Sequence, residues 1–477
     1  MKSRPARRSE WAHDPAGLAA RMPVGFTMGV ATAAFQIEGA IRDDGREPST
    51  WDTFMAQPGR ILDSSSAAVT TDHYHRYRED VALMRELGID SYRFSLSWPR
   101  IQPAGKGAAN RAGIAFYDRL LDELLAAGIR PMATLYHWDT PEALQRAGGW
   151  LNRDTAYRLA DYAYLAGEAF GDRVDAWVTI NEPATVTLNG YAIGVHAPGE
   201  TLLFDALPAA HHQLLGHGFA VEALRAAGVT GAIGIANVHS PIEPASDDPQ
   251  DALFASLFDI IHNRVSADPV LLGRYPSPPE ELRGLLTALE EVEPSDLVTI
   301  SQPLDFYGLN YYRPTRIRAG APAAGTSPDG ASDAMRRLPF SLAPWPEFPQ
   351  TGFGWPIAPG YLRVALCELV ERYGDALPPV QITEGGASFV DTVDTVGTDG
   401  SIDDAERIDY LAEHIAVAFE GVPGIDVRGY HIWSLLDNWE WAAGFSQRFG
   451  LVRVNFATQD RTPKRSYRWL QTLLARS

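Results

Sequence analysis

The sequence predicts an α/β fold, a single (β/α)8 TIM barrel with extended loops at its C-terminal face. Short apolar runs, rich in β-branched and aromatic residues, alternate with longer amphipathic helical patterns along the chain. Eight such runs occur, which is the number of strands that closes a barrel of this type. The length of 477 residues would allow two or three average domains, but a single barrel often exceeds the average domain length.

The expected strands follow one another where apolar residues cluster. They are residues 26–32, 91–97, 130–137, 176–181, 231–238, 305–310, 379–384 and 428–434. Helical patterns lie between them, for example at 77–88, 115–128 and 405–415, and several stop at a glycine, a common helix end. This strict alternation is what a parallel barrel requires, because each parallel strand needs a long crossover connection.

We expect residues 1–20 to form a poorly ordered N-terminal arm and residues 21–477 to form one (β/α)8 catalytic domain. The Pro-, Gly- and Ala-rich stretch 318–339 has the composition of a linker. It lies between the sixth and seventh strands, however, so we interpret it as a long barrel loop. Whether the aromatic residues that follow it only pack this loop is left open; they are Phe340, Trp345, Phe348, Phe353 and Trp355.

Composition argues against several classes of protein. The formal net charge of −19 disfavours a nucleic-acid or anionic-membrane binder, since both need a basic surface. The single cysteine, Cys367, excludes an intrachain disulfide and fits a reducing compartment; its amphipathic surroundings predict a buried structural thiol. The basic start lacks the apolar region of a signal peptide, and no apolar stretch has transmembrane length. We therefore expect a cytoplasmic protein, and a homo-oligomer is left open.

Polar and aromatic residues gather at the ends of the predicted strands, where a TIM barrel carries its functional groups. These residues are Gln36 and Glu38 after the first strand, Arg93 in the second, His137 and Trp138 at the third, Asn181 and Glu182 at the fourth, Asn310, Tyr311 and Tyr312 at the sixth, Glu384 at the seventh, and Trp433 with the run DNWEW (437–441) at the eighth. Packing alone does not explain such residues at seven strand ends. The sequence therefore predicts one polar site at the C-terminal face.

Two carboxylates, Glu182 and Glu384, each follow an apolar strand directly. Glycoside hydrolysis uses such a pair, in which one group protonates the leaving oxygen and the other attacks or activates water. Either residue alone could instead pair with an arginine or cap a helix. The surroundings favour a carbohydrate, because aromatic rings stack on sugar faces and polar groups share hydrogen bonds with hydroxyls. These candidates are Trp138, Trp433, Trp439 and Trp441, and Gln36, His137, Asn181, Asn310 and Glu440.

Other chemistries find less support. The histidine-rich stretches DHYHRY and HHQLLGH lack the ligand set of a zinc site, so we interpret them as packing histidines. No P-loop or dinucleotide-binding fingerprint is present in the sequence. We therefore expect neither a metal nor a cofactor.

Taken in order, the motifs resemble those of glycoside hydrolase family 1, the retaining β-glucosidases and their relatives. The resemblance runs from about residue 26 to residue 469 and includes FTMGVATAAFQIEG, LYHWDTPEAL, TINEP, DFYGLNYY, ITEGG and YHIWSLLDNWEWAAGFSQRFGL. It implies an exo-acting retaining β-glycosidase, foremost a β-glucosidase that hydrolyses terminal β-D-glucosyl residues. The substrates would be small β-glycosides or short β-linked oligosaccharides, as in cellulose degradation, and no cofactor would be needed.

The resemblance also implies roles for individual residues. Glu182 corresponds to the general acid/base and Glu384 to the nucleophile, while Arg93 and Tyr312 match groups that contact the nucleophile. Positions that match the sugar-binding set are Gln36, His137, Asn181, Asn310, Trp433, Glu440, Trp441 and Phe449, and Trp138 joins them from its place at the third strand end. Retention of configuration would require the two carboxyl groups to lie roughly 5–5.5 Å apart.

Two departures from the family pattern bear on function. Gly385 replaces an Asn that commonly follows the nucleophile, and Ala184 is small where many members carry an aromatic residue, which suggests a wider aglycone site. Glu440 would repel a sugar phosphate, and the intact Glu182 disfavours a thioglycosidase. A preference for β-galactosides or β-fucosides, or transglycosylation on the same scaffold, stays open. A non-catalytic sugar-binding protein is disfavoured, because both carboxylates are present.

Overall fold

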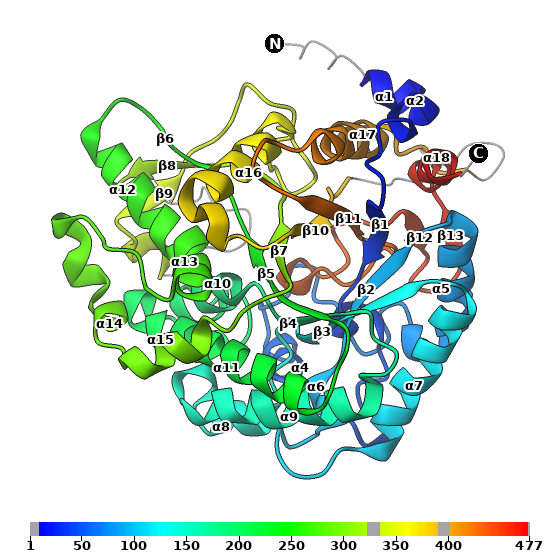
Figure 1. Cartoon of the computed structure of the whole chain (residues 1–477), viewed down its shortest axis with the longest axis horizontal. Helices are drawn as coiled ribbons and strands as arrows, with labels where there is room; N and C mark the ends of the chain where they lie inside the picture. Colours follow the sequence, from blue (N-terminus) through cyan, green and yellow to red (C-terminus); the bar gives the residue numbers. More distant parts are fainter. Residues whose placement is uncertain (1–8, 322–333, 390–400, 476–477) are drawn as a thin grey trace.

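The computed structural model describes residues 9–321, 334–389 and 401–475. Eight parallel strands close into a barrel in the order β1-β11-β10-β7-β5-β4-β3-β2, and helices surround it (Figure 1). The barrel strands are β1 (Thr27–Ala31), β2 (Ser91–Ser95), β3 (Arg130–Tyr136), β4 (Ala176–Asn181), β5 (Ala232–Val238), β7 (Phe306–Asn310), β10 (Val380–Gly385) and β11 (Val427–Trp433). The predicted fold is confirmed, and each predicted strand ends within two residues of an observed one.

The strands are visible in the sequence because they are buried on both faces. Every residue of β1, β2, β4 and β7 is buried, so these strands read as continuous apolar runs rather than as alternating ones. One large cluster of apolar side chains lies between the strands and the outer helices, and Met28 at its centre is fully buried. The barrel is therefore a packed scaffold that holds its strand ends in fixed positions.

The outer layer consists of helices that follow the strands. They are α5 (His73–Leu87), α7 (Arg111–Ala126), α9 (Asp154–Phe170), α11 (Leu207–Ala226), α12 (Pro249–Asp259), α13 (Val265–Leu272), α14 (Thr287–Glu290), α15 (Pro294–Ile300), α16 (Gly360–Tyr373), α17 (Ala405–Glu420) and α18 (Arg465–Leu474). The three helices predicted at 77–88, 115–128 and 405–415 are α5, α7 and α17. Within the described ranges, no helix combines the length and the apolar character that crossing a bilayer would take.

The segment after β5 and the long segment between β7 and β10 together build a small separate sheet. Strands β6 (Ile242–Pro244), β8 (Thr315–Ala319) and β9 (Phe340–Leu342) pair there in that order. Trp345 is buried beside this sheet, and the guanidinium of Arg316 lies 3.7 Å from its ring centroid. The linker-like stretch 318–339 thus begins and ends in this sheet, and its residues 322–333 lie outside the described ranges.

The N-terminal segment contains two short helices, α1 (Glu10–His13) and α2 (Pro15–Ala19), where the sequence predicted a poorly ordered arm. Asp14 caps α2 by accepting a hydrogen bond from the Gly17 amide, and Leu18 is fully buried. Both helices lie against α17 and α18 near the C-terminus (Figure 1). This packing explains their order. Residues 1–8 lie outside the described ranges.

The prediction of a buried thiol at Cys367 is wrong. Cys367 lies on α16 and is exposed, whereas Leu366 and Leu369 of the same helix are buried. The amphipathic pattern was read correctly as a helix, but Cys367 falls on its outer side. A cysteine is small enough to be tolerated on either side of a helix, so its position could not be assigned from its type.

Candidate active site

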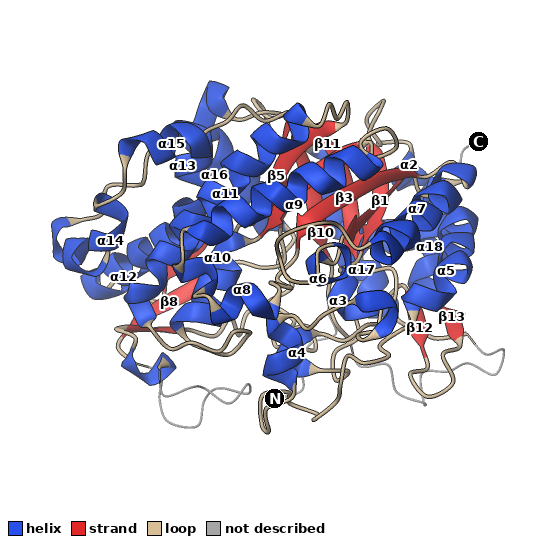
Figure 2. Ribbon diagram, turned by 90° about the horizontal axis from the view of Figure 1, so that it is seen from below, coloured by secondary structure: helices blue, strands red, loops and turns tan. Residues whose placement is uncertain are grey.

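The C-terminal ends of the barrel strands lead into a layer of short helices. These are α3 (Ala34–Ile37), α6 (Trp98–Ile101), α8 (Glu142–Arg146) and α10 (Pro183–Thr185), which follow β1 to β4, together with α4 (Thr50–Met55). Figure 2 shows them on one side of the strands, below the sheet. The strand ends that the sequence singled out therefore share one face, as the barrel geometry requires.

Glu384, near the end of β10, is held by two donors, one from β2 and one from the segment that follows β7. The guanidinium of Arg93 on β2 forms an ion pair with Oε1 of Glu384, and both side chains are almost completely buried. The hydroxyl of Tyr312 donates a hydrogen bond of 2.6 Å to Oε2. A cation and a phenol hydroxyl thus stabilise negative charge on this carboxylate, and they fix its orientation.

Glu182 directly follows β4 and has different partners. The amide of Asn310 donates to its Oε1 at 2.7 Å, and the hydroxyl of Thr185 donates to its Oε2 at 2.7 Å. Glu182 is 6% exposed and has a left-handed backbone conformation (φ 49°), at the point where the chain leaves the strand and enters α10. Neutral groups alone contact this carboxylate directly among the described residues, in contrast to Glu384.

One hydrogen-bond network joins the two carboxylates. Asn181 Oδ1 accepts from Arg93 Nη2 at 2.7 Å and from Asn310 Nδ2 at 3.0 Å. Arg93 also contacts Glu384, and Asn310 also contacts Glu182. Glu384 and Glu182 are therefore linked through Arg93, Asn181 and Asn310, and these contacts fix the position of each carboxylate relative to the other.

Burial and charge give Glu182 the properties of a proton donor. Burial, followed by the negative charge of Glu384, raises its pKa to about 7, although hydrogen bonds from Asn310 and Thr185 act in the opposite direction. Burial, assisted by the charge of Arg93, lowers the pKa of His137 well below its usual value, so this imidazole is neutral. The site thus combines a carboxyl group that holds a proton near neutral pH with a second carboxylate beside a cation.

Further polar groups line the same site. Gln36 Nε2 donates to Asn438 Oδ1 and to the Trp439 carbonyl, both at 3.0 Å, and to Glu440 Oε2 at 3.3 Å. His137 Nε2 accepts from Asn181 Nδ2 at 3.1 Å. Within the described part of the chain, Gln36 Oε1 and His137 Nδ1 are buried without a hydrogen-bond partner. Such atoms are costly to bury, so they favour a ligand that carries several hydroxyl groups.

Aromatic rings border these polar groups. The ring centroids of Trp138 and Trp441 are 4.5 Å apart. The ring centroid of His137 lies 5.8 Å from that of Trp441 and 5.9 Å from that of Trp433. Phe449 packs 6.4 Å from Tyr312. Trp439 is fully buried, and its indole N–H donates to the Ser65 hydroxyl, so it supports the site from behind.

The structure thus brings most of the predicted site residues into one connected group, and it adds residues that sequence reasoning missed. Glu38 and Tyr311 have other partners: Glu38 pairs with the buried Arg100, and the Tyr311 hydroxyl donates to the Ala358 carbonyl. Thr185 contacts Glu182, and Thr383 donates to Asn310 Oδ1 at 2.7 Å. Phe353 and Trp355, which were left open as loop-packing residues, stack at 4.8 Å, and Trp355 lies 5.7 Å from Tyr312. The spacing of three residues between Glu182 and Thr185 permits this contact, but it depends on the left-handed backbone of Glu182, which the sequence does not reveal.

Of the histidines in the two histidine-rich stretches, His73, His211 and His217 are buried, whereas His75 is exposed. His73 pairs with Asp80 at 2.7 Å, and His211 pairs with Asp296 at 3.0 Å. His217 shares a hydrogen bond with the Thr179 hydroxyl. In the ranges that the structure describes, no group of three or more His, Cys, Asp or Glu residues has a metal-binding arrangement.

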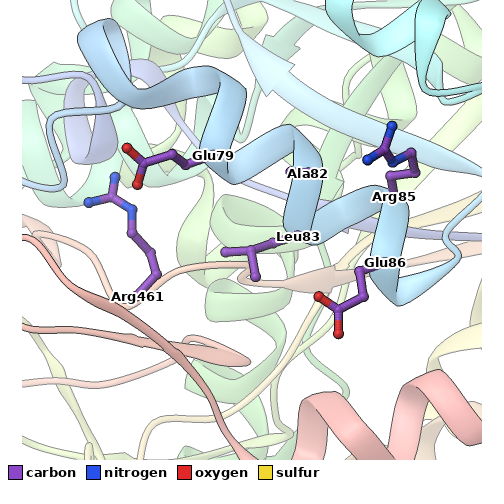
Figure 3. Close-up of a pocket in the computed structure, with 6 residues that line it drawn as sticks. All are labelled: Glu79, Ala82, Leu83, Arg85, Glu86 and Arg461. Carbon is purple, nitrogen blue, oxygen red and sulfur yellow. The ribbon is translucent and has the colours of Figure 1, made fainter.

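A separate surface pocket lies between α5 and β13 (Arg461–Pro463), which pairs with β12 (Val452–Val454). Figure 3 shows its lining, which consists of Glu79, Ala82, Leu83, Arg85, Glu86 and Arg461. None of the site residues discussed above contributes to it. Its charged groups are engaged elsewhere, since Glu79 pairs with Arg76 and Arg461 pairs with Asp80.

Ala184 does not border an open pocket. It is 2% exposed and packs in a second apolar cluster with Leu207, Ala210 and Ile260. The small side chain therefore fits the packing of α10 against α11 and its neighbours. The expectation that it widens the aglycone site has no support from its position.

A steric clash explains why glycine, and not a larger residue, occupies position 385. A Cβ atom at this position would lie 2.2 Å from the hydroxyl oxygen of Tyr430 on β11, which is far too close for two non-bonded atoms. Gly385→Ala should therefore shift the end of β10 and lower the stability by about 1–3 kcal/mol. We expect a lower Tm and a lower kcat, because the neighbouring Glu384 moves with the strand.

The double variant Gly385→Ala, Tyr430→Phe provides the control, since it removes the closest colliding atom. The ring carbon Cζ would still lie 2.8 Å from the new Cβ, so Tm and kcat should recover only in part. A single Gly385→Ala variant with unchanged Tm and kcat would contradict the steric explanation.

Comparison with known proteins agrees with this geometry. Residues 18–477 match the family model described as glycosyl hydrolase family 1. A β-glucosidase from an Agrobacterium species is 43% identical over 465 residues, which is 96% of each chain. A bifunctional β-D-glucosidase/β-D-fucosidase from Bifidobacterium breve is 42% identical and aligns over 95% of this chain and 98% of its own. The crystal structure of a psychrophilic β-glucosidase from Micrococcus antarcticus has a TM-score of 0.88 and 44% identity, with 96% and 98% of the two chains covered.

Proposed function

The chain belongs to glycosyl hydrolase family 1, and we propose that it is an exo-acting retaining β-glucosidase. It removes terminal non-reducing β-D-glucosyl residues from small β-glycosides or short β-linked oligosaccharides. The observation that carries this proposal is the difference between two buried carboxylates at the ends of β4 and β10. Glu384 is paired with a cation, whereas Glu182 has neutral partners and a pKa raised to about 7.

The roles follow from this difference. Glu384 is the nucleophile: its oxygen attacks the anomeric carbon, and Arg93 and Tyr312 orient the carboxylate. Glu182 donates its proton to the departing aglycone oxygen. The same group, now ionised, takes a proton from water, which attacks the glycosyl-enzyme and releases the sugar with retained configuration. The charge of Glu384 raises the pKa of Glu182, so esterification of Glu384 lowers that pKa and favours this second role.

The sugar-binding assignment rests on the polar and aromatic residues around the carboxylates. Gln36, His137 and Asn310 are almost completely buried, which fits the closed end of a pocket for a terminal sugar. Buried amide, imidazole and carboxyl groups can share hydrogen bonds with several hydroxyls of one ring. The proposed substrate-binding set is Gln36, His137, Trp138, Asn181, Asn310, Trp433, Glu440, Trp441 and Phe449.

A trapping experiment tests the proposal. A 2-deoxy-2-fluoro β-glucoside with an activated leaving group should form a glycosyl-enzyme that accumulates. The fluorine slows both steps, whereas the activated leaving group speeds only the first, so hydrolysis of the intermediate becomes rate-limiting. Peptide mapping is expected to locate the adduct on Glu384, and NMR of the products from an unmodified substrate should show the β-anomer first. An adduct on another residue, or an inverted product, would overturn the assignment.

Two finer assignments belong to the same proposal. The first is that this enzyme also accepts β-fucosides. The similarity to the bifunctional relative from Bifidobacterium breve supports it, since the name of that protein includes both activities. A panel of β-glucoside, β-galactoside and β-fucoside substrates measures this preference, and product analysis at high acceptor concentration measures transglycosylation. We also propose a cytoplasmic location, which fits a chain with one cysteine, and a role in the degradation of cellulose-derived oligosaccharides.

A further inference from the structure

Thr185 is the one hydroxyl group that contacts the proposed acid/base within the described ranges. Its Oγ1 lies 2.7 Å from Glu182 Oε2, while Asn310 Nδ2 lies 2.7 Å from Oε1. Each carboxyl oxygen of Glu182 therefore has one partner, from a different element of the barrel. Thr185 ends α10 and is partly exposed, whereas Glu182 is buried.

The local backbone explains why this contact forms. Glu182 immediately precedes α10, and the amide of Thr185 donates to the Glu182 carbonyl at 3.0 Å. One helical turn thus returns the chain to Glu182, so the two side chains share a face. The β-branched side chain of Thr185 has few χ1 options, which keeps the hydroxyl in place at a small entropic penalty.

The amide of Asn310 can serve only as a donor to Glu182. Asn181 Oδ1 must accept from the cation of Arg93, so the group that Asn310 directs at Asn181 is its Nδ2. Thr383 donates to Asn310 Oδ1, which gives the same orientation. Because Oε1 accepts a hydrogen bond from Nδ2 in this arrangement, the acidic proton of Glu182 resides on Oε2, next to Thr185.

We propose that Thr185 is a positioning residue for the acid/base, and that its hydroxyl follows the protonation state of Glu182 Oε2. A hydroxyl can both accept and donate a hydrogen bond. Its oxygen accepts a hydrogen bond from the protonated Oε2–H before catalysis, and its O–H donates to the ionised carboxylate after the proton has passed to the aglycone oxygen. The proposal rests on the proposed function, because it assigns no separate reaction to Thr185.

Other charged and titratable groups also face Glu182, so their influence must be separated. Glu384 on β10 and Arg93 on β2 act on its pKa in opposite directions, and the charge of Glu182 in turn raises the pKa values of Tyr312 and Glu440. Burial, followed by Glu384, raises the pKa of Glu440 to about 8. An alkaline decline in activity could therefore arise from either Glu182 or Glu440, and the substrate must distinguish them.

The test compares Thr185→Val, which removes the hydroxyl but keeps the shape, with Thr185→Ser, which keeps the hydroxyl. For cellobiose, whose leaving group needs acid assistance, the alkaline limb of kcat/KM in Thr185→Val should move up by about 0.5–1 pH unit. Both protonation states of Glu182 lose a hydrogen bond, but the charge-assisted bond to the ionised carboxylate is the stronger one. Its kcat/KM at the optimum should fall about 3- to 10-fold, in line with a lost hydrogen bond. Thr185→Ser should match the parent in both respects.

Two controls make the result specific. With 2,4-dinitrophenyl β-glucoside the first step needs no acid, so the limb that moves in Thr185→Val should be absent from kcat/KM, and a limb that belongs to Glu440 should persist unmoved. Thr187→Val removes a hydroxyl from the same helical segment, one that donates to the Pro183 carbonyl, and it should leave the alkaline limb with cellobiose in place.

Several outcomes would overturn the proposal. One is an alkaline limb in Thr185→Val that coincides with that of the parent; another is a Thr185→Ser variant that behaves like Thr185→Val, which would indicate packing instead of hydrogen bonding. In either case the parent enzyme would still hydrolyse β-glucosides and form the trapped adduct on Glu384. Failure of the proposed function is different, because the parent enzyme itself would then give no adduct there.

Discussion

Glu384→Ala is expected to abolish hydrolysis of β-glucosides, with kcat lower by about 10^5- to 10^6-fold, as for other enzymes that lose their covalent nucleophile. The reason is that no other described carboxylate is held by Arg93 and Tyr312 at this point of the barrel. Added azide should restore turnover of an activated aryl glucoside, since the small anion fits the space of the missing carboxylate. The product should be the α-glucosyl azide, identified by NMR.

The control must show that the loss is chemical and not structural. Among the described residues, removal of Glu384 leaves the buried Arg93 with Asn181 and the Thr383 carbonyl as its partners, so a lower Tm is expected as well. Glu384→Gln keeps the shape and should be folded but equally inactive. Glu371→Ala, on the exposed side of α16, should keep full activity. Hydrolysis by Glu384→Ala at more than about a hundredth of the parental rate would contradict the assigned role.

Much of the fold could be predicted from the sequence because a parallel barrel leaves a simple pattern. Its strands are buried on both faces, so all eight appear in the sequence as apolar runs. The regular alternation of these runs with helical patterns indicates one parallel barrel and not two separate sheets. The site followed from the same pattern, since Glu182 and Glu384 each come directly after a strand. Strand ends converge in space even when they lie far apart in the chain.

What could not be predicted depends on the direction of individual side chains. Cys367 and Ala184 are small residues that fit several environments, and their burial was misjudged for that reason. Trp439 lies next to two site residues in the sequence but packs behind the site. The contact between Thr185 and Glu182 depends on a left-handed residue at the strand end, which no sequence pattern marks.

Glu182→Ala should produce a different defect from Glu384→Ala, because acid catalysis matters only for poor leaving groups. For 2,4-dinitrophenyl β-glucoside, kcat/KM should stay close to that of the parent. For cellobiose, it should fall by about 10²- to 10⁴-fold, the usual contribution of a general acid. The pKa of Glu182 is raised to about 7, so its protonated form dominates below pH 7 and is lost above it. The alkaline limb that the parent shows with cellobiose should therefore disappear in the variant.

Added azide distinguishes the roles of the two carboxylates, because the two variants should give glucosyl azides of opposite anomeric configuration. In Glu182→Ala the nucleophile Glu384 still forms the glycosyl-enzyme, and azide then attacks it from the face where water normally enters, which gives the β-glucosyl azide. In Glu384→Ala azide takes the place of the nucleophile, which gives the α-anomer. The same anomer from both variants would contradict the division of roles between the two carboxylates. Opposite anomers require one carboxylate on each face of the sugar, as the double-displacement mechanism demands.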